Sequence, residues 1–454
     1  MALVALAILG IVAMAGLSID VGTLYQAKAE AQRAADAAAL TAARVISLSG
    51  ITGDPTKGST DGSWSAICGA GGTATAAATT VAQQSLIGGA VASAITVNYG
   101  VGSAGASSTT CVGLGAGFAV NPIVTVYVQQ ATLPTFFARV FSLVPGGTSS
   151  NSGVSATATA EVFNPSDSST VAPQTIPVQP RCVKPWIIPN IDPGNGNATF
   201  VATADGSITN GGVQQLGGGV IGESFNLNAD CMPGAANCQP TNMINNPPQV
   251  NTTNPAQPFL EYAPAAVSGT PVAVPSCSSG GYQQSIAGCD QGTVYACGVS
   301  GGGPQIDFTE NPVTPSGVGG DTSEAVQCLI NNSSGTGLGA GQDILVTTAT
   351  PAFPFQIQAG SKNPVVTTGN VTSSNSIVTV PIYDSSSLNP TPLVAGQAVT
   401  IVGFLQVFIN YVDSATGNLN VTVLNVAGCS NNATAAPVFG TSPVPVRLIT
   451  APSS

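Results

Sequence analysis

The first seventeen residues contain no polar or charged side chain, and this run constrains the fold more than any other segment. An α-helix rises about 1.5 Å per residue, so a helix of this length covers most of the apolar thickness of a bilayer. From Leu24 to Ser47 the chain is rich in Ala and free of Gly and Pro, which favours continued helix. Gly50 and Gly53 then supply a stop signal. The sequence predicts one long helix over residues 1–50.

Two alternatives to a lasting apolar helix remain open, a removable signal peptide and a buried helix of a soluble domain. A signal peptide carries a basic segment before its apolar one, but the first basic residue here is Lys28. Ala13-Met14-Ala15 has the small-x-small pattern of a cleavage site. No later segment matches the first in hydrophobicity, which argues against a core helix. A basic leader already removed before Met1 also explains the missing basic flank.

The composition after the helix predicts a β-rich chain with many turns. Charged residues make up 6% of the 454 residues, against about 25% in typical soluble domains. The 54 Gly and 33 Pro residues, with abundant Ser, Thr and Asn, are typical of strands joined by turns and long loops. A surface solvated by hydroxyls and amides suits an extracellular particle or a subunit covered by its own copies.

The charge pattern excludes several function classes. The net charge is −11 with nine Lys and Arg, so the basic patch that a nucleic-acid partner requires is missing. A hydrolytic triad needs a base, usually His, and the chain has none. The string Gly298-Val299-Ser300-Gly301-Gly302 lies in a Gly-rich stretch and is interpreted as chance. No phosphate-binding loop motif occurs. We expect no enzyme activity, no catalytic residue and no cofactor.

The cysteines are even in number and form no C-x-x-C pair, which predicts disulfides formed in an oxidising compartment rather than a zinc site. We predict two local disulfides, Cys68–Cys111 and Cys231–Cys238, and the pairing of the other cysteines stays open. The ten positions are Cys68, Cys111, Cys182, Cys231, Cys238, Cys277, Cys289, Cys297, Cys328 and Cys429.

One short segment offers oxygen ligands for a metal ion. Asp192-Pro-Gly-Asn-Gly-Asn197 places Asp192, Asn195 and Asn197 in a tight Gly-containing loop. Their spacing misses the calcium-loop pattern, so an ordinary Asx turn is the main interpretation. Calcium at these three residues is the weaker alternative.

Periodicity divides the remaining chain into two regions. Residues 51–165 are predicted to form a small α+β domain, with helices from Thr73 and Pro134 and strands from Ala94, Ile123 and Val154. Residues 166–181 are a Pro- and Ser-rich linker.

Residues 182–454 are predicted to form a β-rich outer domain that contains most of the cysteines. Strands are expected from Asp343 and Ser376, and the strands from Ala398 and Leu419 read as one long hairpin. A last strand, PVPVRLIT, is expected at a sheet edge because of its prolines. The fold class is therefore α+β: a long N-terminal helix as a stalk, a small α+β domain and a β-rich, disulfide-containing region.

The segment LSIDVGTLYQAKAEAQRAADAAALTAA resembles the N-terminal signature of TadE/TadG-like proteins of tight-adherence (Tad, Flp-type) pilus systems. The matching positions are Asp20, Val21, Gly22, Tyr25, Gln32, Ala34, Ala35, Asp36, Ala37, Ala38, Ala39 and Leu40. The resemblance is specific over residues 1–165 and implies a pilin-like protein of the bacterial envelope. It also implies that a short leader is cleaved before the apolar helix.

Two departures from this family stand out. Flp-type major pilins are short and carry a Glu near the mature N-terminus, whereas this chain is long and has Ala5 there. Some larger TadG proteins contain a von Willebrand A-type domain whose metal site begins Asp-x-Ser-x-Ser, and the segments at Asp167 and Asp384 do not fit that pattern.

The leading hypothesis is a structural pilin-like subunit of an extracellular bacterial filament, inserted in the inner membrane through its helix before assembly. Its expected partners are copies of itself, the membrane and other pilus-assembly proteins, and not nucleic acid. Two alternatives are an inner-membrane-anchored minor pseudopilin or Tad assembly factor, and an adhesin or tip module. Small residues from Ala27 to Ala43 would let neighbouring helices approach closely. The expected assembly residues are Leu3, Leu6, Ile8, Ile11, Met14, Leu17, Asp20, Tyr25, Ala35 and Asp36.

Overall fold

The computed structural model describes most of the chain, with gaps that fall mainly in its second half. All structural statements below concern the described residues. These are 2–53, 62–102, 105–133, 153–164, 178–196, 198–204, 206–214, 218–229, 258–265, 267, 272, 274, 277, 280–295, 305–307, 321–332, 340–347, 355–385, 398–413, 418–429 and 438–449.

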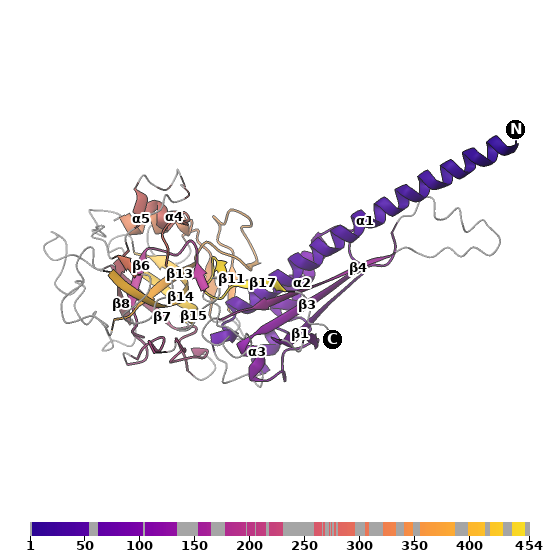
Figure 1. Ribbon diagram of the computed structural model, residues 1–454. Helices are drawn as coiled ribbons and strands as arrows, with labels where there is room; N and C mark the ends of the chain where they lie inside the picture. The colour runs from indigo at the N-terminus through magenta and orange to yellow at the C-terminus, as the bar shows by residue number, and fades with distance from the viewer. Residues whose placement is uncertain are drawn as a thin grey trace.

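The first element is the helix α1, Ala2–Leu48, which confirms the predicted long helix. Its N-terminal part extends away from the rest of the molecule, and its C-terminal part lies on a sheet (Figure 1). Gly50 ends it with a φ of +74°, a conformation that Gly adopts without strain. A Cβ at Gly50 would also lie 2.6 Å from Ile221 Cγ2, so only Gly fits this contact.

An antiparallel five-stranded sheet with the order β17-β4-β3-β1-β2 carries the C-terminal part of α1. The helix α2 packs beside α1 and also contacts β1. The predicted strands from Ala94, Ile123 and Val154 and the helix from Thr73 are confirmed, and the helix expected from Pro134 lies outside the described residues. The bounds are η1 Ile51–Gly53, η3 Gly62–Ala66, α2 Thr73–Gln84, β1 Ala94–Val101, β2 Ala106–Ser108, α3 Ala116–Val120, β3 Pro122–Gln130, β4 Val154–Val162 and β17 Val446–Ile449.

The edge strand β17 comes from the C-terminal end of the sequence. It pairs with β4 in antiparallel register, with Arg447 opposite Glu161, and the two side chains form an ion pair. The predicted edge position is confirmed, but the strand completes the N-terminal sheet. The chain therefore returns to its first domain after building the second region, and the predicted domain bounds stay a prediction.

The second region is built on a sheet with the order β13-β6-β8-β7-β15-β14-β9. An additional pairing of β13 with β14 closes the strands other than β9 into a ring. The predicted hairpin is confirmed, since β14 and β15 pair from Gly403–Gly428 to Val412–Leu419. The bounds are β6 Trp186–Pro189, β7 Ser224–Ala229, β8 Phe259–Pro264, β9 Gln305–Asp307, β13 Ile377–Tyr383, β14 Ala398–Val412 and β15 Leu419–Gly428.

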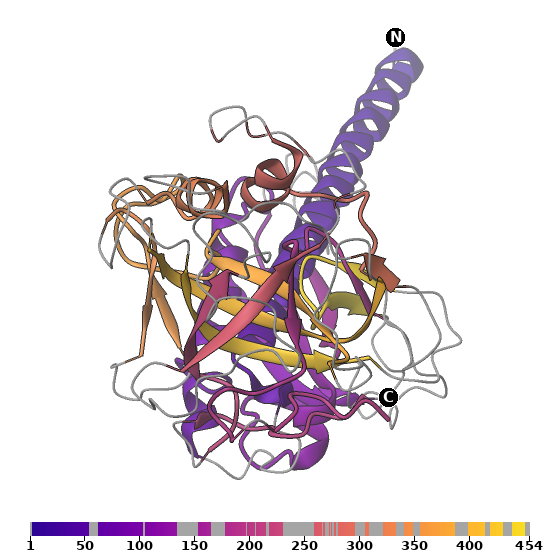
Figure 2. The same ribbon diagram turned by 90° about the vertical axis from the view of Figure 1, so that its left-hand side faces the viewer.

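Smaller elements cover this sheet. The helices α4 and α5 pack together on the outside of the second region (Figures 1 and 2). The strand predicted from Asp343 is present as β10. The bounds are β5 Val178–Pro180, α4 Gly281–Ala287, α5 Asp321–Leu329, β10 Ile344–Val346, β11 Gln356–Gln358, β12 Asn370–Val371 and β16 Val438–Gly440.

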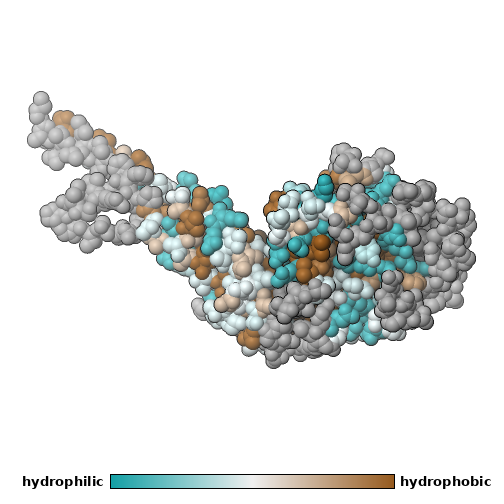
Figure 3. Space-filling view, turned by 180° about the vertical axis from the view of Figure 1, so that it is seen from behind, coloured by the Kyte–Doolittle hydropathy of each residue, from teal (hydrophilic) through white to brown (hydrophobic). Residues whose placement is uncertain are grey.

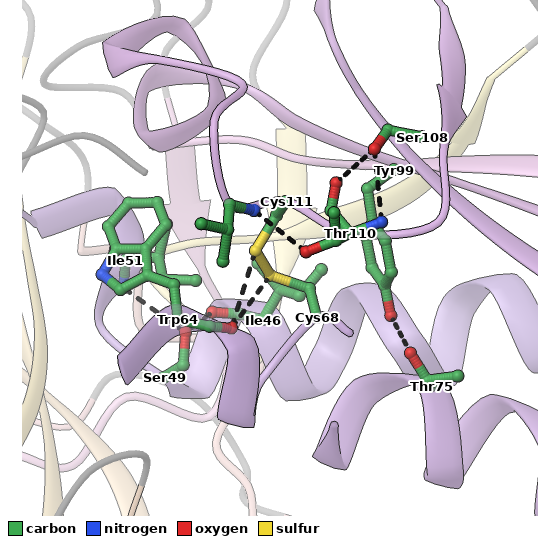
Figure 4. Close-up of a disulfide and its surroundings, with 11 residues drawn as sticks. Ile46, Ser49, Ile51, Trp64, Cys68, Thr75, Tyr99, Ser108, Thr110 and Cys111 are labelled. Atoms are coloured by element: carbon green, nitrogen blue, oxygen red, sulfur yellow. Dashed lines mark hydrogen bonds between the residues drawn. A yellow bond between two sulfur atoms is a disulfide. The ribbon is translucent and has the colours of Figure 1, made fainter. Parts of the chain in front are cut away.

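Three disulfides link described cysteines. Cys68–Cys111 joins the segment before α2 to the segment before α3, as the sequence predicts (Figure 4). The disulfides Cys182–Cys289 and Cys277–Cys328 cross-link the second region, and Cys429 is disulfide-bonded as well. The predicted Cys231–Cys238 pair lies outside the described residues, as does Cys297. The mixed α and β content and the disulfide-containing β-rich region of the predicted fold class are confirmed.

Candidate functional site

The C-terminal half of α1 has a continuous row of small buried side chains. Its alanines face β3, β4 and α2 rather than solvent. Small side chains allow the helix axis to come close to the sheet, so this row packs within the chain. The structure thus gives Ala35 a place in the core of its own domain. The buried members are Ala27, Ala31, Ala34, Ala35, Ala38, Ala39, Ala42 and Ala43.

Polar side chains along this half bind the same sheet. Gln32 Nε2 donates to the main-chain oxygen of Thr157 at 3.2 Å and to Asp36 Oδ1 at 2.8 Å. Lys28 Nζ donates to the main-chain oxygen of Ser155. These contacts fix α1 along β4, and Asp36, one of the expected assembly residues, orients Gln32 within its own subunit.

Glu30 anchors the loop after α2 to α1. Its Oε2 accepts a hydrogen bond from the Gly88 main-chain N–H at 2.7 Å, and its Oε1 accepts one from Gln26 Nε2 at 3.0 Å. The Gly88 N–H lowers the pKa of Glu30 most, followed by the amide of Gln26. The Glu30 carboxylate therefore stays ionised at lower pH than an ordinary glutamate does.

Buried amides tie the end of α1 to the second region. Asn425 Nδ2 on β15 donates to the main-chain oxygen of Ser47 at 2.8 Å, and Ser47 Oγ donates to the main-chain oxygen of Val444 at 2.8 Å. Asn164 Nδ2 bridges the main-chain oxygens of Thr52 and Val426. The stalk helix and the β-rich region thus share a fixed junction.

The N-terminal half of α1 exposes large apolar side chains instead. Val4, Ile11, Met14, Val21 and Tyr25 have exposed fractions between 41% and 75%. At 100° per residue they span roughly one third of the helix circumference. Their spacing of seven, three, seven and four residues fits a and d positions of a heptad, with the exposed Ser18 at one of the skipped positions. We call these five residues the apolar face. Apolar side chains are visible along the projecting helix in Figure 3.

The opposite side of the same half is buried. Gly16 and Asp20 continue the line of Ala27 and Ala31, and Asp20 is 2% exposed. Thr23 Oγ1 donates to the Asp20 main-chain oxygen at 2.8 Å, inside the helix. Leu17 and Ile19 flank the apolar face and are exposed. The predicted assembly residues Ile11, Met14, Leu17 and Tyr25 are therefore accessible, whereas the side chains of Leu3, Leu6 and Ile8 lie outside the described residues.

The predicted calcium residues do not gather around one point. Asp192 is fully buried, its Oδ1 accepts a hydrogen bond from the Gly194 N–H at 3.0 Å, and its Oδ2 accepts one from Asn210 Nδ2 at 3.2 Å. Asn195 is exposed, its main-chain N–H donates to the main-chain oxygen of Asp192, and its main-chain oxygen accepts from Ala198 N. Asn197 lies outside the described residues. The turn is the Asx turn that the sequence predicts, and calcium at this trio stays a prediction.

The structure adds one acidic residue that the sequence analysis missed. Glu223, directly before β7, is 4% exposed and lies against Gly194 of the same turn. Burial, with the neighbouring Asp192 carboxylate as the second cause, raises the pKa of Glu223 to about 9. No local sequence pattern links these two residues, because thirty-one positions separate Asp192 from Glu223. Within the described part of the chain, no three His, Cys, Asp or Glu residues gather as a metal cluster.

Two further sequence expectations are limited by what the structure describes. The Gly298–Gly302 string lies outside the described residues. Over the residues that are described, no helix combines the length and the apolar character needed to cross a membrane. Membrane insertion of α1 therefore stays a prediction.

Comparison with protein families gives a match that falls on α1. No curated protein and no solved structure matches the chain. The Tad family model, described as putative Flp pilus-assembly TadE/G-like, matches residues 1–45. This range covers the apolar face and most of the buried alanine row. Residues 1–45 of this chain therefore carry a TadE/G-like Flp pilus-assembly segment, as the motif around Asp20 and Asp36 predicts.

Proposed function

We propose that this protein is a pilin-like structural subunit of a Tad pilus-related filament on the bacterial surface, and that its copies assemble through the apolar face of α1. The observation that carries the proposal is the division of one helix into two halves. The alanine row is buried in its own subunit, while the side chains of the apolar face in the other half are exposed. Both halves lie in the segment that matches the pilus-assembly family.

The physical driving force is burial of the apolar face against the same face of neighbouring copies. Removing apolar surface from water is worth about 25 cal/mol per Å². Heptad spacing lets two helices keep these side chains in contact over several turns. The small α+β domain and the β-rich region would then lie outside a core of packed helices, as expected for the coat of a filament.

A membrane-inserted state before assembly belongs to the same proposal. It is supported by the sequence, in which no charged residue precedes Asp20. The helix would exchange lipid for neighbouring helices on assembly, and the disulfides of the outer regions agree with export to an oxidising compartment.

A matched pair of substitutions tests the proposal. Val21 lies on the apolar face and Ile19 lies off it, yet both are exposed β-branched residues next to Asp20. We expect Val21→Asp to lower the yield of sheared filaments at least about tenfold, because burying an unpaired carboxylate between helices costs several kcal/mol. Ile19→Asp should assemble nearly as the wild type does. Both substitutions add one charge at nearly the same depth, so a membrane-insertion defect would affect them equally.

The competing function is an inner-membrane-anchored assembly factor present in few copies. The length of the chain favours it, because Flp-type major pilins are short and this chain has 454 residues. Imaging and quantifying material sheared from cells separates the two: a filament subunit is the dominant protein of that fraction, whereas an assembly factor stays with the membrane. Equal assembly of Val21→Asp and wild type would refute the helix-packing proposal.

A further inference from the structure

The turn after β6 and the residue before β7 bring two buried carboxylates together without a cation. Asp192 is fully buried and Glu223 is 4% exposed. Within the described residues, neither side chain forms an ion pair with Lys or Arg. Two buried carboxylates without a positive partner are unfavourable, because each loses hydration and each repels the other. A proton or a metal cation must therefore compensate them.

The hydrogen bonds at the pair leave one acceptor unused. Asp192 accepts from the Gly194 N–H and from Asn210 Nδ2. Glu223 Oε1 is buried and has no donor in hydrogen-bond geometry, although the Glu223 carboxyl group as a whole lies beside the Asp192 carboxyl group and the Gly194 main-chain N–H. Buried carboxylate oxygens in folded proteins nearly always have a partner, so an unsatisfied one points to a missing ligand.

Glycine at position 194 makes room for this oxygen. A Cβ added to Gly194 would lie 2.0 Å from Glu223 Oε1 and 2.3 Å from its carboxylate carbon, so a larger residue at position 194 would displace the Glu223 carboxylate. The φ of Gly194 is not positive, so the backbone alone does not require Gly there. The Gly is needed for space: it lets the Glu223 carboxylate enter the turn formed by Asp192.

Main-chain hydrogen bonds hold the backbone of both acidic residues in place. Asp192 N donates to the main-chain oxygen of Ala198 at 2.7 Å, and the main-chain oxygen of Glu223 accepts from Val423 N on β15 at 2.9 Å. Rigid supports of this kind preorganise ligands for an ion. Calcium prefers oxygen ligands, tolerates irregular geometry and accepts carboxylates together with main-chain oxygens and waters.

We propose that Asp192 and Glu223 form a calcium-binding site beside the Gly194 turn, with Glu223 Oε1 as a direct ligand. The cation would join the turn after β6 to the start of β7 and, through Val423, to β15. The site differs from the expected trio of Asp192, Asn195 and Asn197, because it joins Asp192 to Glu223 and uses neither Asn.

Calcium chloride alone is the probe, added to the purified full chain in mild detergent at constant ionic strength. We expect the thermal midpoint to rise with Ca²⁺ over the range of about 0.1–10 mM, in which extracellular calcium modules bind. Isothermal titration should show one Ca²⁺ per chain. Glu223→Gln should retain the fold, because Gln has the shape of the protonated acid, and should lose both responses.

Matched controls separate site binding from general effects. Glu324 is exposed, so Glu324→Gln removes the same charge and should keep the full calcium response. Gly194→Ala changes no charge and should abolish the response by displacing Glu223. No midpoint shift in the wild type, a shift that persists in folded Glu223→Gln, or an equal shift with Mg²⁺ at the same concentration would overturn the proposal. In those cases a shared proton compensates the pair.

Discussion

Asn425 Nδ2 on β15 donates a hydrogen bond of 2.8 Å to the main-chain oxygen of Ser47, in the last turn of α1. Residues 378 positions apart thus join the stalk helix to the β-rich region. Asn425 is fully buried, and its Oδ1 accepts from the N–H of Val426, so both ends of the amide are used. This side chain, with Ser47 and Asn164, fixes how the two parts of the molecule meet.

Asn425→Ala should therefore loosen this junction. It leaves a buried carbonyl without its donor, at a cost of about 1–3 kcal/mol in the free energy of unfolding. Urea unfolding should show the loss, and limited proteolysis should cut faster near residues 47–53. The exposed Asn370 is the control, since Asn370→Ala removes only a bond to Gln356 at the surface. Equal stability of the two variants would contradict the assigned role.

Substitutions at Ala35 and Ala37 test whether the alanine row packs against the sheet of its own subunit. Ala35 is fully buried against the sheet, and Ala37 is exposed two residues later. Ala35→Glu should unfold the N-terminal domain in the isolated subunit, because it buries a charge without a partner. Ala37→Glu should change the free energy of unfolding by less than about 0.5 kcal/mol. Circular dichroism during thermal unfolding measures both, and a stable, well-folded Ala35→Glu would show that the row is not part of the subunit core.

The Cys182–Cys289 disulfide should stabilise the second region strongly. It closes a loop of 107 residues, for which the chain-entropy model gives about 5 kcal/mol. Replacing both cysteines by Ala should lower the urea midpoint of the full chain more than the same change at Cys68 and Cys111. That pair closes a loop of 43 residues, worth about 4 kcal/mol in the same model. The reverse order would show that strain or residual structure outweighs loop length.

Lys184 should make stability depend on pH. Its Nζ donates to the main-chain oxygens of Ile286 and Gly288 at the end of α4, and full burial lowers its pKa to about 7. The unfolded chain keeps the ordinary pKa of about 10.4, so between pH 7 and 10 the unfolded state binds more protons than the folded one. The contribution of Lys184 to the free energy of unfolding therefore rises with pH across this window and is lowest below pH 7.

Comparing wild type with Lys184→Met isolates this group from others that titrate in the same range. The variant lacks the two hydrogen bonds and the titration, so it should be less stable than the wild type at pH 9.5. The difference should shrink at pH 6.5, where the wild type carries a buried charge. Urea midpoints at both pH values give the measurement, and a difference that stays constant would show that Lys184 remains protonated throughout.

Local signals in the sequence determined a large share of this fold. The uncharged run to Leu17, the Ala-rich continuation and Gly50 determine α1, because helix propensity and termination act within a few residues. Alternating β-branched residues determine β1, β3, β4 and the β14–β15 hairpin for the same reason. The Cys68–Cys111 pair followed from sequence proximity.

Only the tertiary structure decided which partners these elements meet. The alanine row fits a neighbouring helix and its own sheet equally well by pattern, and the structure places it on the sheet. β17 reads as an edge strand in any sheet, yet it pairs with β4 across 284 residues (446 minus 162). Glu223 lies beside Asp192 only because the folded chain brings the turn after β6 close to the start of β7. Periodicity and propensity record how a residue relates to its near neighbours, whereas contacts between distant segments depend on the free energy of the whole packed arrangement.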